Sequence, residues 1–284
     1  MASKAAIAAL KGSLHHESAG NGFTPCEHIA RCSGDPNFMT TLARGLAVIQ
    51  AFSQRRRQVT ISQLSAKTGL SRAAVRRCLY TLSKLGFAGS SDSRHFFLMP
   101  RILTLGYSYI SSTPFGSAVQ PPLQRLSQQL RESCSLATLD GSEIIYIARA
   151  HVTRMMATDL GVGSRLPAFC TSMGRVLLAH LADDELESHL SKIHFERLTE
   201  RTIVSPESLR QVLRLVRHNG YCIVDQELEV GLRSIAVPVK NGCERVVAAL
   251  NIGAPAQRVS IQKMQAEFLP HLRATAEELH MLLR

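Results

Sequence analysis

The first periodic stretch of the chain predicts a helix. Leu42, Leu46 and Ile49 follow one another at intervals of four and three residues, so they share one helix face. Residues 1–38 show no clear periodicity and contain many Gly, Ser and His residues. We therefore expect a flexible extension over residues 1–38 and a folded domain over residues 39–100.

Two further helices are predicted after the first, with a tight turn between them. Thr60 and Gln63 have the spacing of a capping box, which predicts a helix start at Thr60. Gly69 can adopt the left-handed conformation that ends helices, and Ser71 can cap the next helix. The next helix is predicted over residues 72–85 and is amphipathic. A short helix, a glycine turn and an amphipathic helix form the helix-turn-helix pattern.

The helix predicted over residues 72–85 has one apolar and one basic face. Val75, Leu79, Leu82 and Leu85 fall on the apolar side, and three arginines fall on the other. Such a basic face can enter the major groove of DNA, where Arg bonds guanine and Ala contacts the thymine methyl group. The alternative is a solvated helix face without a ligand.

A short hairpin is predicted after this helix. Two extended runs flank the polar turn at residues 89–93, as in the wing of a winged helix-turn-helix, and Arg94 would lie near the DNA backbone. The candidate DNA-binding residues are Arg44, Thr60, Ser71, Arg72, Ala73, Arg76, Arg77, Tyr80 and Arg94.

Charge supports this interpretation. The chain has 284 residues and a formal net charge of +11. Residues 40–100 contain ten basic residues and one acid, Asp92, so nearly all the excess lies in this segment. A basic module joined to a nearly neutral domain is typical of proteins that bind a polyanion.

The remainder of the chain predicts a linker helix and a second domain. A linker is expected over residues 101–118, and mixed strands and helices follow over residues 119–284. Their order lacks the regular alternation of a doubly wound sheet and favours an α/β or α+β domain. The expected strands cover residues 134–139, 144–148, 221–224, 234–239 and 246–252, and the expected helices cover residues 171–181, 205–219 and 262–283.

Composition and motifs exclude several classes. The chain is 45% hydrophobic and 19% charged, as in globular proteins, and Pro and Gly interrupt its longest uncharged central stretch, so we expect no membrane span. Seven scattered cysteines predict free thiols in the cytoplasm rather than a disulfide framework. No HExxH, GxSxG, Walker-type or GxGxxG motif is present, so we expect neither an enzyme nor a bound cofactor.

Two alternatives remain open at this point. The protein could be an enzyme that acts on a small acid, in which case the basic segment would have no role in its function. A thiol- or metal-sensing regulator would use Cys78, or the group Cys26, His28 and Cys32. That group has no second pair of ligands with metal-site spacing, and we predict no metal site.

Residues 42–284 resemble the IclR family of transcriptional regulators. The segments that carry the resemblance, in family order, are RGLAVIQAF (44–52), TGLSRAAVRRCLYTLSKLGF (68–87), LPAFCTSMGRVLLA (166–179) and DQELEVGLRSIAVPV (225–239). The phrases LSRAAVRRCL, LGYSYISS and GSRLPAFCTSMGRVLLA are closest to the subgroup that controls protocatechuate, 4-hydroxybenzoate and β-ketoadipate catabolism.

The resemblance implies an α+β protein with an N-terminal winged helix-turn-helix and a C-terminal GAF-like mixed α/β effector-binding domain. It implies double-stranded operator DNA as partner, a small aromatic or dicarboxylic acid as effector, and self-association into dimers or tetramers. RNA polymerase is a further candidate partner. The function expected is sequence-specific regulation of aromatic-acid catabolism genes.

The resemblance also implies an effector site. Ser172 and Met173 would offer backbone N–H groups at a helix N-terminus, which suits a carboxylate. Asn251 and Gly253 replace two serines of a pyruvate-type pocket, and Val224 stands where some members carry Asp, so a larger, partly apolar acid is favoured. The implied contacts are Thr171, Ser172, Met173, Leu232, Ser234, Asn251 and Gly253.

The acid would also need a cation. Arg149, Arg154, Arg165 and Arg175 are candidates, because Arg pairs with carboxylates through two hydrogen bonds. We favour Arg154 as a hypothesis, since a basic residue in this stretch of the subgroup lies just before the pocket loop.

Overall fold

The computed structural model describes residues 24–32, 34–52, 58–113, 118–151 and 160–283. Two compact units divide the chain, one over residues 22–109 and the other including residues 110–284. Within the described residues, no helix is long and apolar enough to span a membrane.

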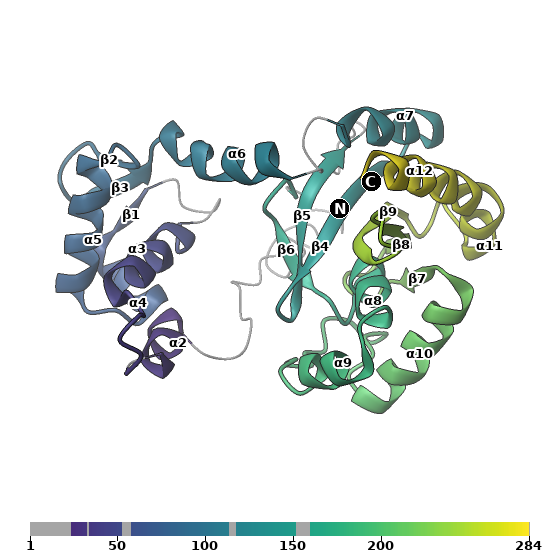
Figure 1. The fold of residues 1–284 in the computed structure, drawn as a ribbon, viewed down its shortest axis with the longest axis horizontal. Coiled ribbons are helices and arrows are strands. Elements are labelled where there is room, and N and C mark those ends of the chain that lie inside the picture. Colours follow the sequence, from purple (N-terminus) through teal and green to yellow (C-terminus); the bar gives the residue numbers. More distant parts are fainter. Residues whose placement is uncertain (1–23, 33, 53–57, 114–117, 152–159, 284) are drawn as a thin grey trace, which may run out of the picture. The chain divides into compact units, whose positions relative to one another are not determined.

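The first unit is a winged helix-turn-helix. Three helices surround its core, and a three-stranded sheet has the order β1-β3-β2 (Figure 1). Val48, Leu64, Val75 and Leu79 are buried at its centre. The elements are α3 (Thr40–Gln50), β1 (Val59–Thr60), α4 (Ile61–Thr68), α5 (Arg72–Lys84), β2 (Ala88–Ser90) and β3 (His95–Leu98).

The predicted caps and hairpin of this unit are confirmed. The Thr60 hydroxyl accepts from the Gln63 amide and the Gln63 side chain accepts from Thr60 N, which completes the capping box at α4. Gly69 ends α4 in the left-handed conformation, and Ser71 caps α5. Strands β2 and β3 pair antiparallel around the polar turn.

The N-terminal segment differs from the expectation. A seven-residue helix, α2 (Pro25–Arg31), lies within residues 1–38, which the sequence predicts as a flexible extension. A capping box between Thr24 and Glu27 starts it, and Cys26 packs against the core of the first unit. A helix of two turns is too short for apolar periodicity to reveal it, so this part of the expectation is corrected.

Part of the apolar surface of the first unit is exposed. On α3, Leu42 is 58% exposed and Leu46 is 47% exposed, while Ala47 and Val48 are buried. The helix α6 (Leu103–Ser112) follows the turn η2 (Pro100–Ile102) and has no buried residue. Its exposed large apolar residues are Leu103, Leu105, Tyr107 and Tyr109.

The second unit is built on a six-stranded antiparallel sheet of order β6-β5-β4-β9-β8-β7. The long central strands were predicted, and the short β6 was not. The strands are β4 (Ser133–Asp140), β5 (Glu143–Ala150), β6 (Arg165–Pro167), β7 (Cys222–Asp225), β8 (Leu232–Lys240) and β9 (Val246–Pro255).

Helices cover both faces of this sheet (Figure 1). One apolar cluster joins one face to α7 and α12, through residues such as Leu123, Leu136 and Leu272. The other joins the opposite face to α8 and α10, through residues such as Met173 and Leu209. The helices are α7 (Gln120–Leu130), α8 (Ser172–Ala179), α9 (Asp183–Leu190), α10 (Pro206–Asn219), α11 (Ile261–Lys263) and α12 (Leu269–Leu282).

The C-terminal helix predicted over residues 262–283 is present, but it contains a π-helical turn that the sequence did not predict. A π-helical turn, η3 (Met264–Phe268), separates α11 from α12. Pro270 lies in the first turn of α12 and has no N–H, so the regular hydrogen-bond pattern cannot continue across it.

Candidate functional site

The helix α5 presents a basic surface. Val75, Leu79 and Leu82 are buried against the core, as predicted. Leu85, predicted on the same side, is 51% exposed because the helix ends there. Arg72, Ala73, Arg76, Arg77 and Tyr80 are exposed, as their helical spacing predicts. Lys84 extends this surface, with its ammonium group 5.5 Å from the centre of the Tyr80 ring.

The other predicted DNA-binding residues have mixed environments. Arg44 is exposed on α3. The Thr60 and Ser71 hydroxyl oxygens accept hydrogen bonds from the backbone amides of Gln63 and Ala74. Each residue therefore caps the start of a helix, in addition to any contact with DNA. A hydroxyl that accepts such a bond can still donate its proton to a phosphate.

The tip of the wing is organised by Asp92. Its carboxylate accepts hydrogen bonds from the backbone amides of Arg94 and His95, and it lies 2.6 Å from the His95 ring. These bonds hold the pKa of Asp92 well below its usual range. The acid therefore shapes the turn, and the exposed Arg94 side chain remains the basic group of the wing.

Cys78 has little thiolate character. The side chain is half-buried on α5, and burial raises the pKa of its thiol despite the opposing charges of Arg44 and Arg77. A raised pKa reduces the reactive form at neutral pH. The described residues also contain no cluster of three or more His, Cys, Asp or Glu side chains suited to a metal ion.

A second site lies where α8 begins. The Thr171 hydroxyl accepts from the Gly174 amide and donates to the Pro167 carbonyl, which fixes the start of the helix. Ser172 and Met173 follow, each about 1% exposed. Their amides occupy the first turn, which has no helical partners, and the helix dipole makes this position favourable for an anion.

The strand register brings the other predicted effector residues together on the sheet face that α8 covers. Asn251 on β9 lies opposite Ala236 on β8, and Gly253 lies opposite Ser234. Ala236 belongs to the same apolar cluster as Met173, so this row faces α8. The Leu232 side chain borders the same region, since a Cβ atom on Gly253 would lie 3.8 Å from its Cδ1 atom.

Two polar atoms in this region have no hydrogen-bond partner within the described part of the chain. They are the Ser172 hydroxyl oxygen and the Asn251 side-chain oxygen, in residues that are 1% and 8% exposed. Buried polar groups are almost always hydrogen-bonded, and an unpaired one costs about 1–3 kcal/mol. A ligand between α8 and the sheet would satisfy both atoms.

Two of the four candidate arginines already have carboxylate partners. Arg165 pairs with Asp140 and Glu143. Arg175 is buried and pairs with both oxygens of Glu227, at 2.6 Å each. Its Nε atom donates to the Phe169 carbonyl. Arg175 therefore has a structural role and is not free to bind a ligand. The favoured candidate, Arg154, lies outside the described residues.

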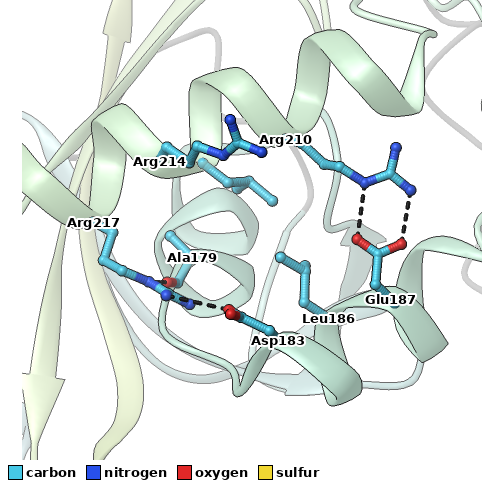
Figure 2. A pocket seen from close by; sticks show the side chains of 8 residues that line it. Ala179, Asp183, Leu186, Glu187, Arg210, Arg214 and Arg217 are labelled. Carbon is cyan, nitrogen blue, oxygen red and sulfur yellow. Dashed lines mark hydrogen bonds and ion pairs between the residues drawn. The ribbon is translucent and has the colours of Figure 1, made fainter.

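An open cleft of about 230 Å³ lies elsewhere in this unit, between α8, α9 and α10 (Figure 2). Two of its arginines are engaged. Arg210 forms two hydrogen bonds with Glu187, and Arg217 donates to the Leu181 carbonyl at 2.7 Å. None of the predicted effector residues lines it, and its arginines on α10 hold α9 and the end of α8 in place.

Sequence reasoning missed the partner of Arg175. Glu227 lies 52 residues away, and it also accepts from the Ile203 amide at 3.0 Å. The motif that contains Glu227 was recognised, but no local pattern indicates that an acid in a loop faces a buried arginine.

Comparisons with known proteins agree with this architecture. Residues 41–91 match the IclR helix-turn-helix domain, and residues 107–281 match the bacterial transcriptional regulator IclR C-terminal domain. A Pca regulon regulatory protein of Pseudomonas putida is 51% identical over 257 residues, which cover 90% of this chain and 88% of the relative.

Solved structures show the same fold. A transcriptional regulator from Rhodococcus sp. RHA1 is 46% identical, with a TM-score of 0.76 over 87% of this chain and 98% of that chain. An IclR homologue from Microbacterium hydrocarbonoxydans, complexed with 4-hydroxybenzoate, is 26% identical, with a TM-score of 0.71 over 86% of this chain and 99% of that chain. The predicted winged helix-turn-helix and mixed effector-type domain are thus confirmed, and the chain belongs to the IclR family of bacterial transcriptional regulators.

Proposed function

We propose that this protein binds operator DNA through the basic face of α5 and regulates genes of aromatic-acid catabolism in response to a small organic acid. The exposed basic face of α5, opposite the buried side chains of Val75, Leu79 and Leu82, is the observation that carries the DNA-binding part. Arg44, Thr60, Ser71 and Arg94 are proposed as supporting contacts to the DNA backbone.

The effector part rests on the site at α8. The unpartnered Ser172 and Asn251 atoms and the first turn of α8 would bind an acid, with Thr171, Leu232 and Ser234 around them. The relatives support the class of ligand, since one carries the name Pca regulon regulatory protein and another is complexed with 4-hydroxybenzoate. The candidates are protocatechuate, 4-hydroxybenzoate and β-ketoadipate.

A thiol-sensing function has less support. Burial raises the pKa of Cys78, and it also raises the pKa of Cys170 and Cys222 to about 12. A cysteine that senses oxidants needs an accessible thiolate at neutral pH. These three thiols are therefore better explained as packed side chains.

Fluorescence anisotropy with the upstream intergenic DNA of the gene tests the proposal. We expect the protein to prefer this duplex over a scrambled one, and one of the three acids to change the affinity. The double substitution Arg76→Ala/Arg77→Ala should cost about 1–3 kcal/mol of binding free energy for each lost base contact, and each lost phosphate contact should reduce the salt slope by about one.

The matched control is Arg125→Ala, which removes an exposed arginine of α7 that pairs with Glu278. It should leave DNA binding unchanged. Equal affinity of the wild-type protein for both duplexes would contradict the regulator proposal. An α5 variant that binds as tightly as the wild type would show that another surface contacts DNA.

We also propose that the protein self-associates through α3 and α6. Leu42 on α3 is 58% exposed, and Leu103 and Tyr107 on α6 are 71% and 68% exposed. Apolar side chains grouped on helix faces in this way mark contact surfaces, and a second copy of the chain is the commonest partner for such a surface.

Sedimentation equilibrium should therefore show dimers or tetramers. The substitutions Leu42→Glu and Leu103→Glu should each weaken association at least tenfold, because each would bury a charge without a partner. Leu215→Glu is the control, since Leu215 is 61% exposed on α10 and outside these helices. A monomeric wild-type protein, or equal association of all variants, would contradict this proposal.

A further inference from the structure

The side chain of Arg149 lies on the same face of the sheet as the side chain of Asn251. The antiparallel register places Arg149 of β5 opposite Ser135 of β4, and Ser135 opposite Asn251 of β9. Side chains opposite each other in an antiparallel sheet lie on the same face. The row therefore runs Arg149, Ser135, Asn251 and then Ala236, across four neighbouring strands.

This row and the next one contain a single charge. The next row runs from Ser133 through Gly253 and Ser234 to Val224. The members of both rows are neutral apart from Arg149. The positive charge therefore lies on the face that α8 covers, where the candidate effector residues meet.

The environment of Arg149 keeps its charge available. Within the described residues no carboxylate pairs with it, unlike Arg165 and Arg175. Its guanidinium carbon lies 5.9 Å from the centre of the buried Tyr146 ring, which holds the group in place without neutralising it. Its backbone carbonyl accepts from Gln120 of α7 at 3.0 Å, which fixes the end of β5.

We propose that Arg149 binds the carboxylate of the effector acid and sets the preference of the site for anions. This inference rests on the proposed effector function. Neighbouring strands lie about 4.8 Å apart, so Arg149 and Asn251 start from backbones about 10 Å apart. An acid with a carboxylate at one end and a second polar oxygen at the other spans the space between their side chains.

The second oxygen meets Ser172 and Asn251. The Ser172 hydroxyl can donate or accept a hydrogen bond, and the Asn251 amide offers both functions. A ring hydroxyl or a second carboxylate can bond to these groups. The ligand class is therefore an organic acid with polar oxygens at both ends and an apolar middle.

Isothermal titration calorimetry tests this inference, because the chain has no Trp for a fluorescence titration. The ligands are 4-hydroxybenzoate, protocatechuate and β-ketoadipate, each with its neutral carboxamide, and benzoate as an acid without the second oxygen. The proteins are the wild type, Arg149→Gln, Arg149→Lys, Arg154→Gln and the surface control Arg125→Gln.

We expect the wild type to bind one acid more tightly than its amide. The substitution Arg149→Gln should weaken binding of that acid about 10- to 100-fold, because it removes a charge-assisted hydrogen-bonded pair. The variant should then bind the acid and its amide with similar affinity. Arg149→Lys should restore part of the preference, and Arg125→Gln should match the wild type. A variant that merely distorts the site would weaken acid and amide equally.

Four results would overturn the inference. Arg149→Gln could retain the wild-type preference for the acid, or it could weaken acid and amide by the same factor. Arg154→Gln could abolish the preference while Arg149→Gln leaves it intact, which assigns the role to Arg154. If the wild type binds operator DNA but none of the acids, the effector part of the proposed function fails as well.

Discussion

Replacing Gly174 with Ala is expected to destabilise the second unit by at least about 3 kcal/mol, or to prevent it from folding. A Cβ atom on Gly174 would lie 2.1 Å from the Ala168 carbonyl oxygen and 2.3 Å from the Ala168 Cα atom. Both contacts are with backbone, so no side-chain rotation can relieve them. Denaturant unfolding followed by circular dichroism measures the effect.

The matched control is Gly161→Ala in the same unit. A Cβ atom there meets no heavy atom within 4 Å, so its stability should stay within about 0.5 kcal/mol of the wild type. If the Gly174→Ala variant were as stable as the wild type, the segment before α8 would have to be able to move away from the helix.

Replacing Arg175 with Met is expected to cost about 3–5 kcal/mol of unfolding free energy. The substitution removes two hydrogen bonds to Glu227 and one to the Phe169 carbonyl. It leaves a buried carboxylate that keeps only the hydrogen bond from the Ile203 amide within the described residues. The cost comes mainly from this uncompensated charge, and chemical denaturation measures it.

Two further variants separate the charge from the packing. Arg175→Met/Glu227→Met removes both charges and should be less destabilised than the sum of the single changes. Arg210→Met breaks an exposed pair with Glu187 and should have a much smaller effect. Equal losses from Arg175→Met and Arg210→Met would contradict a special role for the buried pair.

This pair also helps to position the residues of the proposed effector site. The Arg175 side chain ties the segment before α8 to the loop after β7, through Phe169 and Glu227. Thr199 and Thr202 donate to backbone carbonyls of that loop, at Gln226 and Glu227. Loss of Arg175 should therefore reduce effector affinity even though the side chain does not face the ligand.

The missed features have two kinds of physical cause. Leu42 and Leu46 have helical spacing, but spacing does not say whether another element covers the face. The helix α2 is too short for a periodic pattern, and η3 depends on how the chain packs around Pro270. The exposure of Leu42 and Leu46 depends on residues beyond the local window, whereas the capping box of α2 and Pro270 are local signals.

Local chemistry determined the elements of the first unit. The capping box at Thr60, the left-handed turn at Gly69 and the cap at Ser71 act within three or four residues, so the sequence alone predicts them. The division of α5 into a buried apolar face and an exposed basic face follows from its helical period in the same way. The exposed basic face that we propose to bind DNA was therefore predictable from the sequence.

The proposed effector site could be assembled only from the tertiary structure. The resemblance indicated Ser172 and Asn251, but strand register decided that Arg149 shares a row with Asn251. Packing across 52 residues decided that Arg175 pairs with Glu227. Hydrogen bonds between strands and buried ion pairs join residues that are distant in sequence, and their free energy depends on burial, which no local pattern specifies.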